Sequence, residues 1–345
     1  FVQVFSWLLL KEIVVNITTL LKKELPQAHI IWTSTNGEII NWSAINNSII
    51  ISFSIFDNVE LDSTFIDFDK ERKIKKDYNK IFSKIINDKT KLIIIFSDWL
   101  TPEIEDILKN FHSFRPDIFI WWWKAGDNLS FKDCFIFNWE RIIDRGMVMV
   151  SFSADKLFVN NLYNFWWLEV GPLLKVTSSK WVMLGRINWE SVVKAYKRYL
   201  WEEVANNLEK YGVEFPIIIE RSWLKIARCP LRVNMDWSVI ISWNLKEWDI
   251  VRFWVWNKDY IINYSYLLVN EIIKRCPAET IFLYSSWARK NLLWEDMNSR
   301  LILFQKLATT AWFFWYNQFF HDENGNYCFN LTSVGLILSE KGDKL

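Results

Sequence analysis

Tryptophan occupies positions in this chain where a tight turn favours glycine. Asn41-Trp42, Asn138-Trp139, Asn188-Trp189 and Asp236-Trp237 each stand beside an apolar, strand-like segment. Asn-Gly and Asp-Gly are the strongest short hairpin signals, because a type I′ turn needs a positive φ at both central residues. Glycine reaches that conformation freely, whereas a bulky L-residue does not. These dipeptides therefore predict turns in which tryptophan is the wrong residue.

The composition supports this interpretation. The chain of 345 residues has Gly 9 and Trp 23, whereas average usage of about 7% would give roughly 24 glycines. Trp201, Trp248 and Trp294 also stand at expected ends of elements, where glycine is common. We hypothesise that most of these tryptophans are glycines in the natural protein, from a source whose code reads UGA as glycine but was translated with UGA as tryptophan. With tryptophan as written, we expect distorted or splayed loops.

The segment DIFIWWWKAGDNLSF, residues 117–131, poses the same question. Strand-like residues 117–120 lead into three tryptophans, and residues 124–128 have the composition of a turn. The rings would form a platform for single-stranded nucleic acid only if they were interleaved with a basic groove, and only Lys124 is near. We therefore favour a glycine run that links a buried strand to a ligand-facing turn.

Strand-like and helical segments alternate along the whole chain. Expected strands include residues 1–5, 91–96 and 280–284, and expected helices include residues 11–25, 102–110 and 260–275. This mixture predicts an α/β fold of mixed α+β layers. Residues 20–33 and 304–313 both end a helix, turn and enter a strand, which indicates two related halves, each with mixed sheets flanked by helices. The length also allows two domains.

Charge and cysteine content favour no special partner. Lys+Arg 41 against Asp+Glu 40 gives a net charge of +1, so we expect no nucleic-acid partner. Cys134, Cys229, Cys276 and Cys328 show no metal or disulfide spacing, which predicts free thiols and a cytoplasmic location. No apolar run approaches the roughly 18 residues of a membrane span. Because the chain begins at Phe1, we expect a fragment of a longer protein.

Six separated segments, with glycine at the suspect positions, carry a resemblance to a known family. They are Trp32 to Ile39 (like G-T-S-T-x-G-E-I), residues 122–127 (like G-G-x-A-G-D), residues 166–172 (like G-W-x-x-x-G-P), residues 282–296, residues 313–316 and residues 320–326. In this order they resemble the FIST family, named for F-box and intracellular signal transduction proteins. The resemblance implies a FIST N-terminal domain over residues 1–165 and a FIST C-terminal domain over residues 166–340. One departure is Tyr316-Asn317-Gln318, which stands where Y-G-E would mirror Glu38.

The resemblance implies the sensory input module of a bacterial signalling protein. Such a module binds a small ligand, for example an amino acid, and passes its state to a downstream output domain or to a partner such as a histidine kinase. We expect the ligand-binding residues to be Thr33, Ser34, Thr35, Glu38, Gly126, Asp127, Ser285, Arg289 and Tyr316. Arg289 is the best candidate to bind a ligand carboxylate, since guanidinium binds it bidentately; a structural ion pair is the alternative.

A haem-binding sensor of nitric oxide is the alternative function. His321 would then be the axial ligand, although a simple loop histidine before Asn324-Gly325 also fits the sequence. We expect no other cofactor. None of the three histidines lies in H-E-x-x-H or G-x-S-x-G, and Glu295-Asp296 fits a helix N-terminus better than an acid/base pair. We therefore expect that the chain is not an enzyme, and catalysis ranks third, after the haem-binding sensor.

Overall fold

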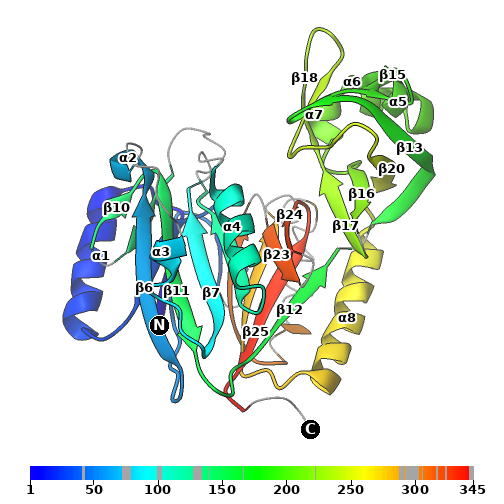
Figure 1. Ribbon diagram of the computed structural model, residues 1–345. Coiled ribbons are helices and arrows are strands. Elements are labelled where there is room, and N and C mark those ends of the chain that lie inside the picture. The colour runs from blue at the N-terminus through cyan, green and yellow to red at the C-terminus, as the bar shows by residue number, and fades with distance from the viewer. Residues whose placement is uncertain are drawn as a thin grey trace.

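The structure is a computed structural model in which strands and helices alternate and form several mixed sheets (Figure 1). It describes residues 1–40, 43–71, 79–98, 103–126, 134–138, 140–165, 167–221, 223–286, 292, 303–304, 306–315, 318–322 and 325–341. The predicted fold class, mixed α+β layers, is confirmed.

One arrangement of strands occurs three times along the chain. The first unit consists of β1 (Val2–Ser6), α1 (Lys11–Glu24), β2 (Ile30–Ser34), β3 (Glu38–Ile40), β4 (Ser43–Ile45) and β5 (Ile49–Phe53). The second consists of β7 (Thr90–Ser97), α4 (Glu103–Phe114), β8 (Phe119–Lys124), β9 (Ile136–Asn138), β10 (Ile142–Ile143) and β11 (Gly146–Ser153). The third contains β21 (Thr280–Ser286), β22 (Thr309–Trp315), β23 (Gln318–Asp322), β24 (Gly325–Phe329) and β25 (Ser333–Ser339). In each unit two parallel strands are followed by a hairpin, and the last strand is antiparallel to the first.

Each hairpin leaves its own sheet and extends the sheet of another unit. The hairpin β3–β4 pairs with β22, the hairpin β23–β24 pairs with β8, and the hairpin β9–β10 pairs with β2. The resulting sheets have the orders β10-β9-β2-β1-β5, β24-β23-β8-β7-β11-β6 and β4-β3-β22-β21-β25-β12. The three sheets are therefore interlocked in a closed cycle, and the early and late parts of the chain share sheets.

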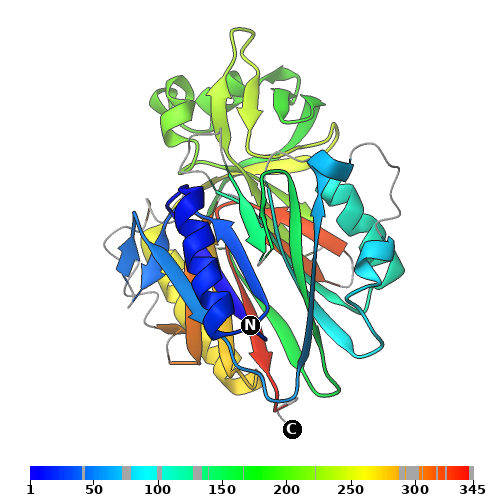
Figure 2. The ribbon, with the colours of Figure 1, turned by 90° about the vertical axis from the view of Figure 1, so that its left-hand side faces the viewer.

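The remaining strands and helices of this body lie at the edges and faces of the sheets (Figures 1 and 2). They are β6 (Glu60–Asp67), α2 (Phe68–Glu71), α3 (Asn79–Phe82), β12 (Phe158–Asn164) and α8 (Lys258–Arg275). Helix α4 buries Ile104, Ile107, Leu108 and Phe111, which recur at the spacing of one helix face. Burying each such side chain contributes about 1.5–3 kcal/mol, so this face fixes the helix on its sheet.

Residues 168–255 form a second lobe between β12 and α8, at the upper right of Figure 1. Its elements are β13 (Leu168–Lys180), β14 (Met183–Ile187), β15 (Glu190–Ser191), α5 (Val192–Tyr199), α6 (Glu202–Asn206), α7 (Leu208–Tyr211), β16 (Ile217–Arg221), β17 (Leu224–Arg228), β18 (Pro230–Val233), β19 (Val239–Ile241) and β20 (Ile250–Val255). The strands share one further sheet, in the order β17-β16-β20-β13-β14-β19-β18 with β15 beside β14. The helices of the lobe pack against this sheet, and its strands do not join the three interlocked sheets.

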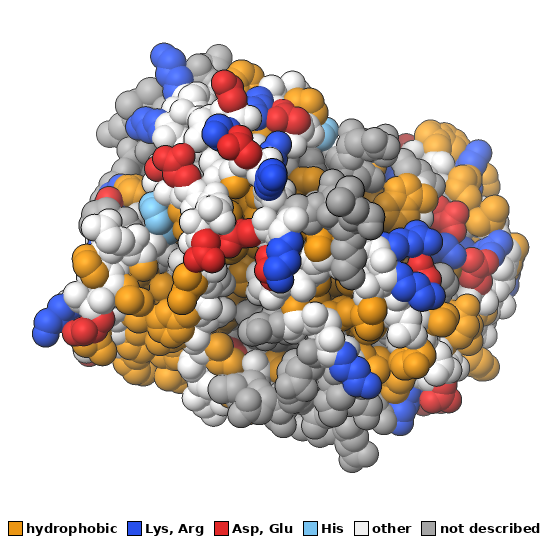
Figure 3. Space-filling model, turned by 90° about the horizontal axis from the view of Figure 1, so that it is seen from below, with side chains coloured by type: hydrophobic (Ala, Val, Ile, Leu, Met, Phe, Trp, Pro, Cys, Tyr) orange, Lys and Arg blue, Asp and Glu red, His pale blue; other side chains and the backbone are white. Residues whose placement is uncertain are grey.

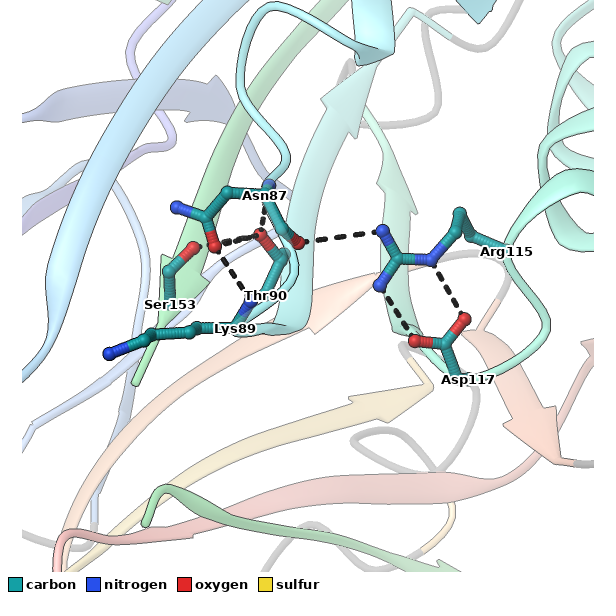
Figure 4. Close-up of polar contacts among 6 residues, drawn as sticks. All are labelled: Asn87, Lys89, Thr90, Arg115, Asp117 and Ser153. Atoms are coloured by element: carbon teal, nitrogen blue, oxygen red, sulfur yellow. Dashed lines mark hydrogen bonds and ion pairs between the residues drawn. The ribbon is translucent and has the colours of Figure 1, made fainter. Parts of the chain in front are cut away.

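Polar contacts stabilise the N-terminal ends of β7 and β8, opposite the ends where the hairpins are exchanged (Figure 4). The Thr90 and Ser153 hydroxyls are 2.8 Å apart. Arg115 donates to both carboxylate oxygens of Asp117, over 2.8 and 2.7 Å, and this hydrogen bonding lowers the pKa of the Asp117 carboxyl. Viewed from below (Figure 3), basic and acidic side chains are interspersed among apolar ones, in keeping with the net charge of +1.

The three consecutive tryptophans lie inside a strand and not at a turn. Strand β8 runs through Trp121, Trp122 and Trp123 to Lys124, so the three tryptophans belong to the strand and do not link it to a turn, and the turn expected from Lys124 does not begin there. Successive side chains point to opposite faces, so Trp122 packs in a different apolar cluster from its two neighbours. All three rings are buried, because both faces of this sheet are covered.

Four exposed tryptophans take the left-handed backbone conformation. Trp181, Trp189, Trp237 and Trp248 have φ of 58°, 68°, 63° and 73°, and they are four of the seven such non-glycine residues in the described chain. Asn188, at φ 47°, and Trp189 together form the two-residue loop between β14 and β15, the pattern of a type I′ turn. The turn positions predicted at Trp189, Trp237 and Trp248 are therefore of the kind that favours glycine.

The expectation of distorted or splayed loops at these tryptophans is wrong. The loop after β18 closes through Asn234 N to Ser238 O, 2.9 Å, and Trp237 N to Asn234 O, 3.0 Å. The ring of Trp237 is 59% exposed. A compact turn forms because its backbone hydrogen bonds are kept while the indole is turned to solvent. Trp201 does not share the conformation, with φ −121° at the start of α6. Trp42, Trp139 and Trp294 lie outside the described residues.

Candidate functional site

The carboxyl ends of β2, β8 and β22 meet where the hairpins are exchanged. Gly126 N donates to Ser34 O over 2.8 Å, and the Ser34 hydroxyl donates to Gly126 O over 2.6 Å. Asn36 N donates to Phe314 O over 3.3 Å, and Phe314 N donates to Gly37 O over 2.9 Å. We call residues 33–38, 124–126 and 313–315 the strand-end junction. It joins three segments that are far apart in sequence.

Glu38 is the buried carboxylate of this junction. It is the first residue of β3, opposite Phe313 of β22, and it is fully buried. The hydroxyls of Thr35 and Ser48 donate to its two oxygens, the latter over 2.5 Å. Hydrogen bonds to the ionised form offset the cost of burying a carboxylate. Glu38 can therefore remain in the interior as a strong acceptor.

Gly126 is required by the close approach of two chain segments. A Cβ on Gly126 would lie 2.9 Å from both the carbonyl carbon of Thr35 and Oδ1 of Asn36. Real Cβ atoms essentially never approach so closely. Glycine therefore allows the loop after β8 to hydrogen-bond to the end of β2.

The structure brings together five of the predicted ligand-binding residues and places a sixth nearby. Thr33, Ser34, Thr35, Glu38 and Gly126 all belong to the strand-end junction and are buried. Ser285 lies on β21, beside β22, and its hydroxyl is 2.7 Å from that of Ser333. These side chains form a covered polar layer. Asp127, Arg289 and Tyr316 lie outside the described residues, as does the side chain of His321, whose backbone belongs to β23.

The equivalent position to Glu38 in the exchanged hairpin of the third unit is occupied by an amide residue. Gln318, the first residue of β23, pairs with Trp123 of β8, much as Glu38 pairs with Phe313 of β22. Glu38 and Gln318 therefore begin equivalent strands, and the carboxylate that the sequence lacks is missing at the position equivalent to Glu38. The junction has one acidic hairpin start and one neutral one.

Lys124 links the junction to the second lobe. Its side chain is buried, and its Nζ lies 5.4 Å from the centre of the Trp122 ring and 4.6 Å from that of Trp243. Cation–π contacts of this kind stabilise a buried ammonium. Trp243, Asn244 and Lys246 of the lobe, together with Arg228, line a cleft beside Trp122. Sequence reasoning did not single out this group, because no spacing links these residues along the chain.

The described part of the chain has no cluster of metal-binding side chains, and its cysteines form no disulfide. No three His, Cys, Asp or Glu side chains there gather closely enough to hold a metal ion. The four cysteines are free thiols, as predicted. Burial raises the pKa of the Cys229 thiol to about 12, which suits a structural role better than a reactive one.

Among the helices that the structure describes, none is both long enough and apolar enough to cross a membrane.

Comparison with known proteins identifies the family. A family model described as the FIST N domain matches residues 1–190. This match spans more than half of the 345 residues and includes the first two units up to β11. None of the curated proteins compared with the chain matches it. The chain therefore belongs to the FIST family, whose domains serve as sensory modules in signal transduction.

Proposed function

We propose that this chain is the sensory input module of a bacterial signal-transduction protein and binds a small ligand such as an amino acid at the strand-end junction. The observation that carries the proposal is the cyclic exchange of hairpins at this junction. A ligand that contacts the ends of β2, β8 and β22 touches all three sheets at once. Its binding energy can then shift a conformational equilibrium of the whole body.

The polar layer suits a small zwitterion. Glu38 is a buried acceptor that matches a ligand ammonium, and Gly126 allows the loop after β8 to pack against the end of β2 beside it. Strand carboxyl ends are the common location of ligand sites in α/β sheets. In this proposal Arg289, the residue predicted from the sequence to bind a carboxylate, binds the carboxylate of the ligand. The output is a downstream domain or a partner such as a histidine kinase, in the cytoplasm.

A thermal-shift screen of amino acids, followed by calorimetry, tests the proposal. At about 100 times its Kd, a ligand adds roughly 2.7 kcal/mol to the free energy of unfolding. Glu38→Gln should weaken binding while keeping the fold, and Glu60→Gln, an exposed residue on β6, is the matched control. Failure of every amino acid to bind the folded protein, or equal affinity of the two variants, would contradict the proposal.

We further propose that residues 166–340 contain the family's C-terminal domain and that glycine replaces most of the tryptophans in the natural protein. The order of the family-like segments supports the first statement, and the left-handed φ of four tryptophans supports the second. The source codons are the test. UGA at Trp181, Trp189, Trp237 and Trp248, with glycine found there by mass spectrometry of the natural protein, is expected; UGG would refute the idea.

A further inference from the structure

A basic cleft lies at the seam between the second lobe and the sheet that contains β8. It is lined from one side by α4, β8 and β24, and from the other by β16, β17 and the residues Trp243, Asn244 and Lys246. Its volume is about 230 Å³. It is built from residues outside the strand-end junction. The two sites therefore share no lining residue, and Lys124 of the junction contacts Trp122 and Trp243 of the cleft.

Arg228 places a buried positive charge in this cleft. The residue is only 4% exposed. Its Nε donates to Asn244 O over 3.1 Å, and its Nη1 donates to Ala227 O and Cys328 O over 2.9 and 3.2 Å. All three acceptors are neutral carbonyls, and Nη2 makes no hydrogen bond within the described chain. The two N–H groups of Nη2 are thus left for a further acceptor.

The other charged lining residues have the same sign. Four cations, Lys109, Arg221, Arg228 and Lys246, line the cleft, and no Asp or Glu is among its described lining residues. Asp249, which lies outside the lining, pairs with Arg221 over 3.2 Å. Burial lowers the pKa of Arg228 to about 10, which shows that desolvation opposes its charge. An anion in the cleft would offset that cost.

The walls of the cleft select the kind of anion. Trp122, Trp243 and Tyr327 contribute rings, and Leu108 and Ile226 contribute aliphatic surface. Such walls favour an anion with an apolar part over a fully hydrated inorganic ion. The volume of about 230 Å³ is below that of sites for drug-sized ligands, which start at about 300 Å³. The ligand must therefore be small.

We propose that this cleft binds a small organic carboxylate, with the carboxylate on Arg228 and the carbon chain against the apolar walls of the cleft. Nη2 of Arg228 offers its two N–H groups to the carboxylate, and the planar guanidinium, held by its three carbonyl contacts, fixes their direction in a way that a lysine does not reproduce. The charge recognition rests on Arg228 and not on the rings, so glycine at positions 122 and 243 would change the size of the ligand but not its class.

Calorimetry at constant ionic strength tests this proposal with a series of carboxylates of about two to five carbons, and with phosphate. Arg228→Met should reduce affinity at least about tenfold, and Arg228→Lys should restore it only in part. Lys246→Glu, at an exposed rim position, should also weaken binding and does not threaten the core. Arg186→Met, on the exposed face of β14, is the control that should bind normally.

A second readout uses Cys328, which is half-buried and lines the same cleft. Bound carboxylate should slow its alkylation, and Lys246→Glu should abolish that protection. The proposal is overturned if no carboxylate binds, if Lys246→Glu binds as tightly as the unchanged protein, or if phosphate binds as well as the best carboxylate. None of these results depends on amino-acid binding at the strand-end junction, so the two proposals fail separately.

Discussion

Replacing Trp237 by glycine and by alanine measures the backbone strain at the turn after β18. Both changes remove an indole that is 59% exposed, but only alanine keeps a Cβ at φ 63°. A Cβ in the left-handed region costs about 1–2 kcal/mol, and the freedom of glycine in the unfolded chain costs about 0.5–1 kcal/mol. The glycine variant should therefore be the more stable of the two, by about 0.5–1 kcal/mol.

Met235 provides the matched control. It lies in the same turn, it is fully exposed, and its φ is not positive. No strain is relieved there, so the alanine variant should be more stable than the glycine variant by about 0.5–1 kcal/mol. Urea unfolding followed by far-ultraviolet circular dichroism gives the free energy of unfolding for all four variants. The same order of stability at both positions would refute the reasoning, because φ would then not distinguish them.

Four further predictions concern other residues. Gly126→Ala should lower the free energy of unfolding by about 1–3 kcal/mol through overpacking at the strand-end junction; an unchanged urea midpoint would contradict this. Cys229, whose pKa burial raises to about 12, should resist iodoacetamide until the chain unfolds, and peptide mass spectrometry that finds labelled native protein would show otherwise. Arg115→Gln removes the hydrogen bonds that lower the pKa of Asp117. The stability that these hydrogen bonds contribute is present above the unfolded-state pKa of Asp117 and is lost as the pH falls through its folded-state pKa. Because the carboxylate is mostly exposed, the variant should lose under about 1 kcal/mol of unfolding free energy near neutral pH and nothing near pH 2. An equal deficit at both pH values would argue against this explanation. If haem is bound, a Soret band should disappear in His321→Ala, and protein purified with haem supplied that shows no such band would end the haem alternative.

Local sequence patterns predicted the helices and strands well where the tertiary packing agreed with them. The helix expected over residues 11–25 is α1, Lys11–Glu24, and the helix expected over residues 260–275 lies within α8, Lys258–Arg275. Their apolar periodicity and their capping or terminating residues act over a few neighbours, so a sequence contains the needed information. Strand β8 was misjudged because three tryptophans beside an Ala-Gly pair resemble a broken strand. Burial on both faces of the sheet overrides that local signal.

The hairpin exchange could not be predicted from the sequence. A free sheet edge presents unpaired N–H and C=O groups that any strand can satisfy. Nothing in residues 38–45 therefore specifies β22 as the partner, and nothing in residues 318–329 specifies β8. The turn tryptophan at Trp181 was also missed, because Lys180-Trp181 lacks the Asn or Asp that precedes Trp189 and Trp237.

By itself the sequence determined the alternation of strands and helices, the turn positions where tryptophan conflicts with the backbone, and the polar segment Trp32 to Ile39 that resembles the FIST family. These properties depend on residues close together in the chain. Only the tertiary structure decided that Glu38 is buried beside β22, and that Arg228 meets Trp122 and Cys328 in one cleft. Both arrangements join segments about 100 residues or more apart, whose meeting depends on the packing of whole sheets and not on local propensity.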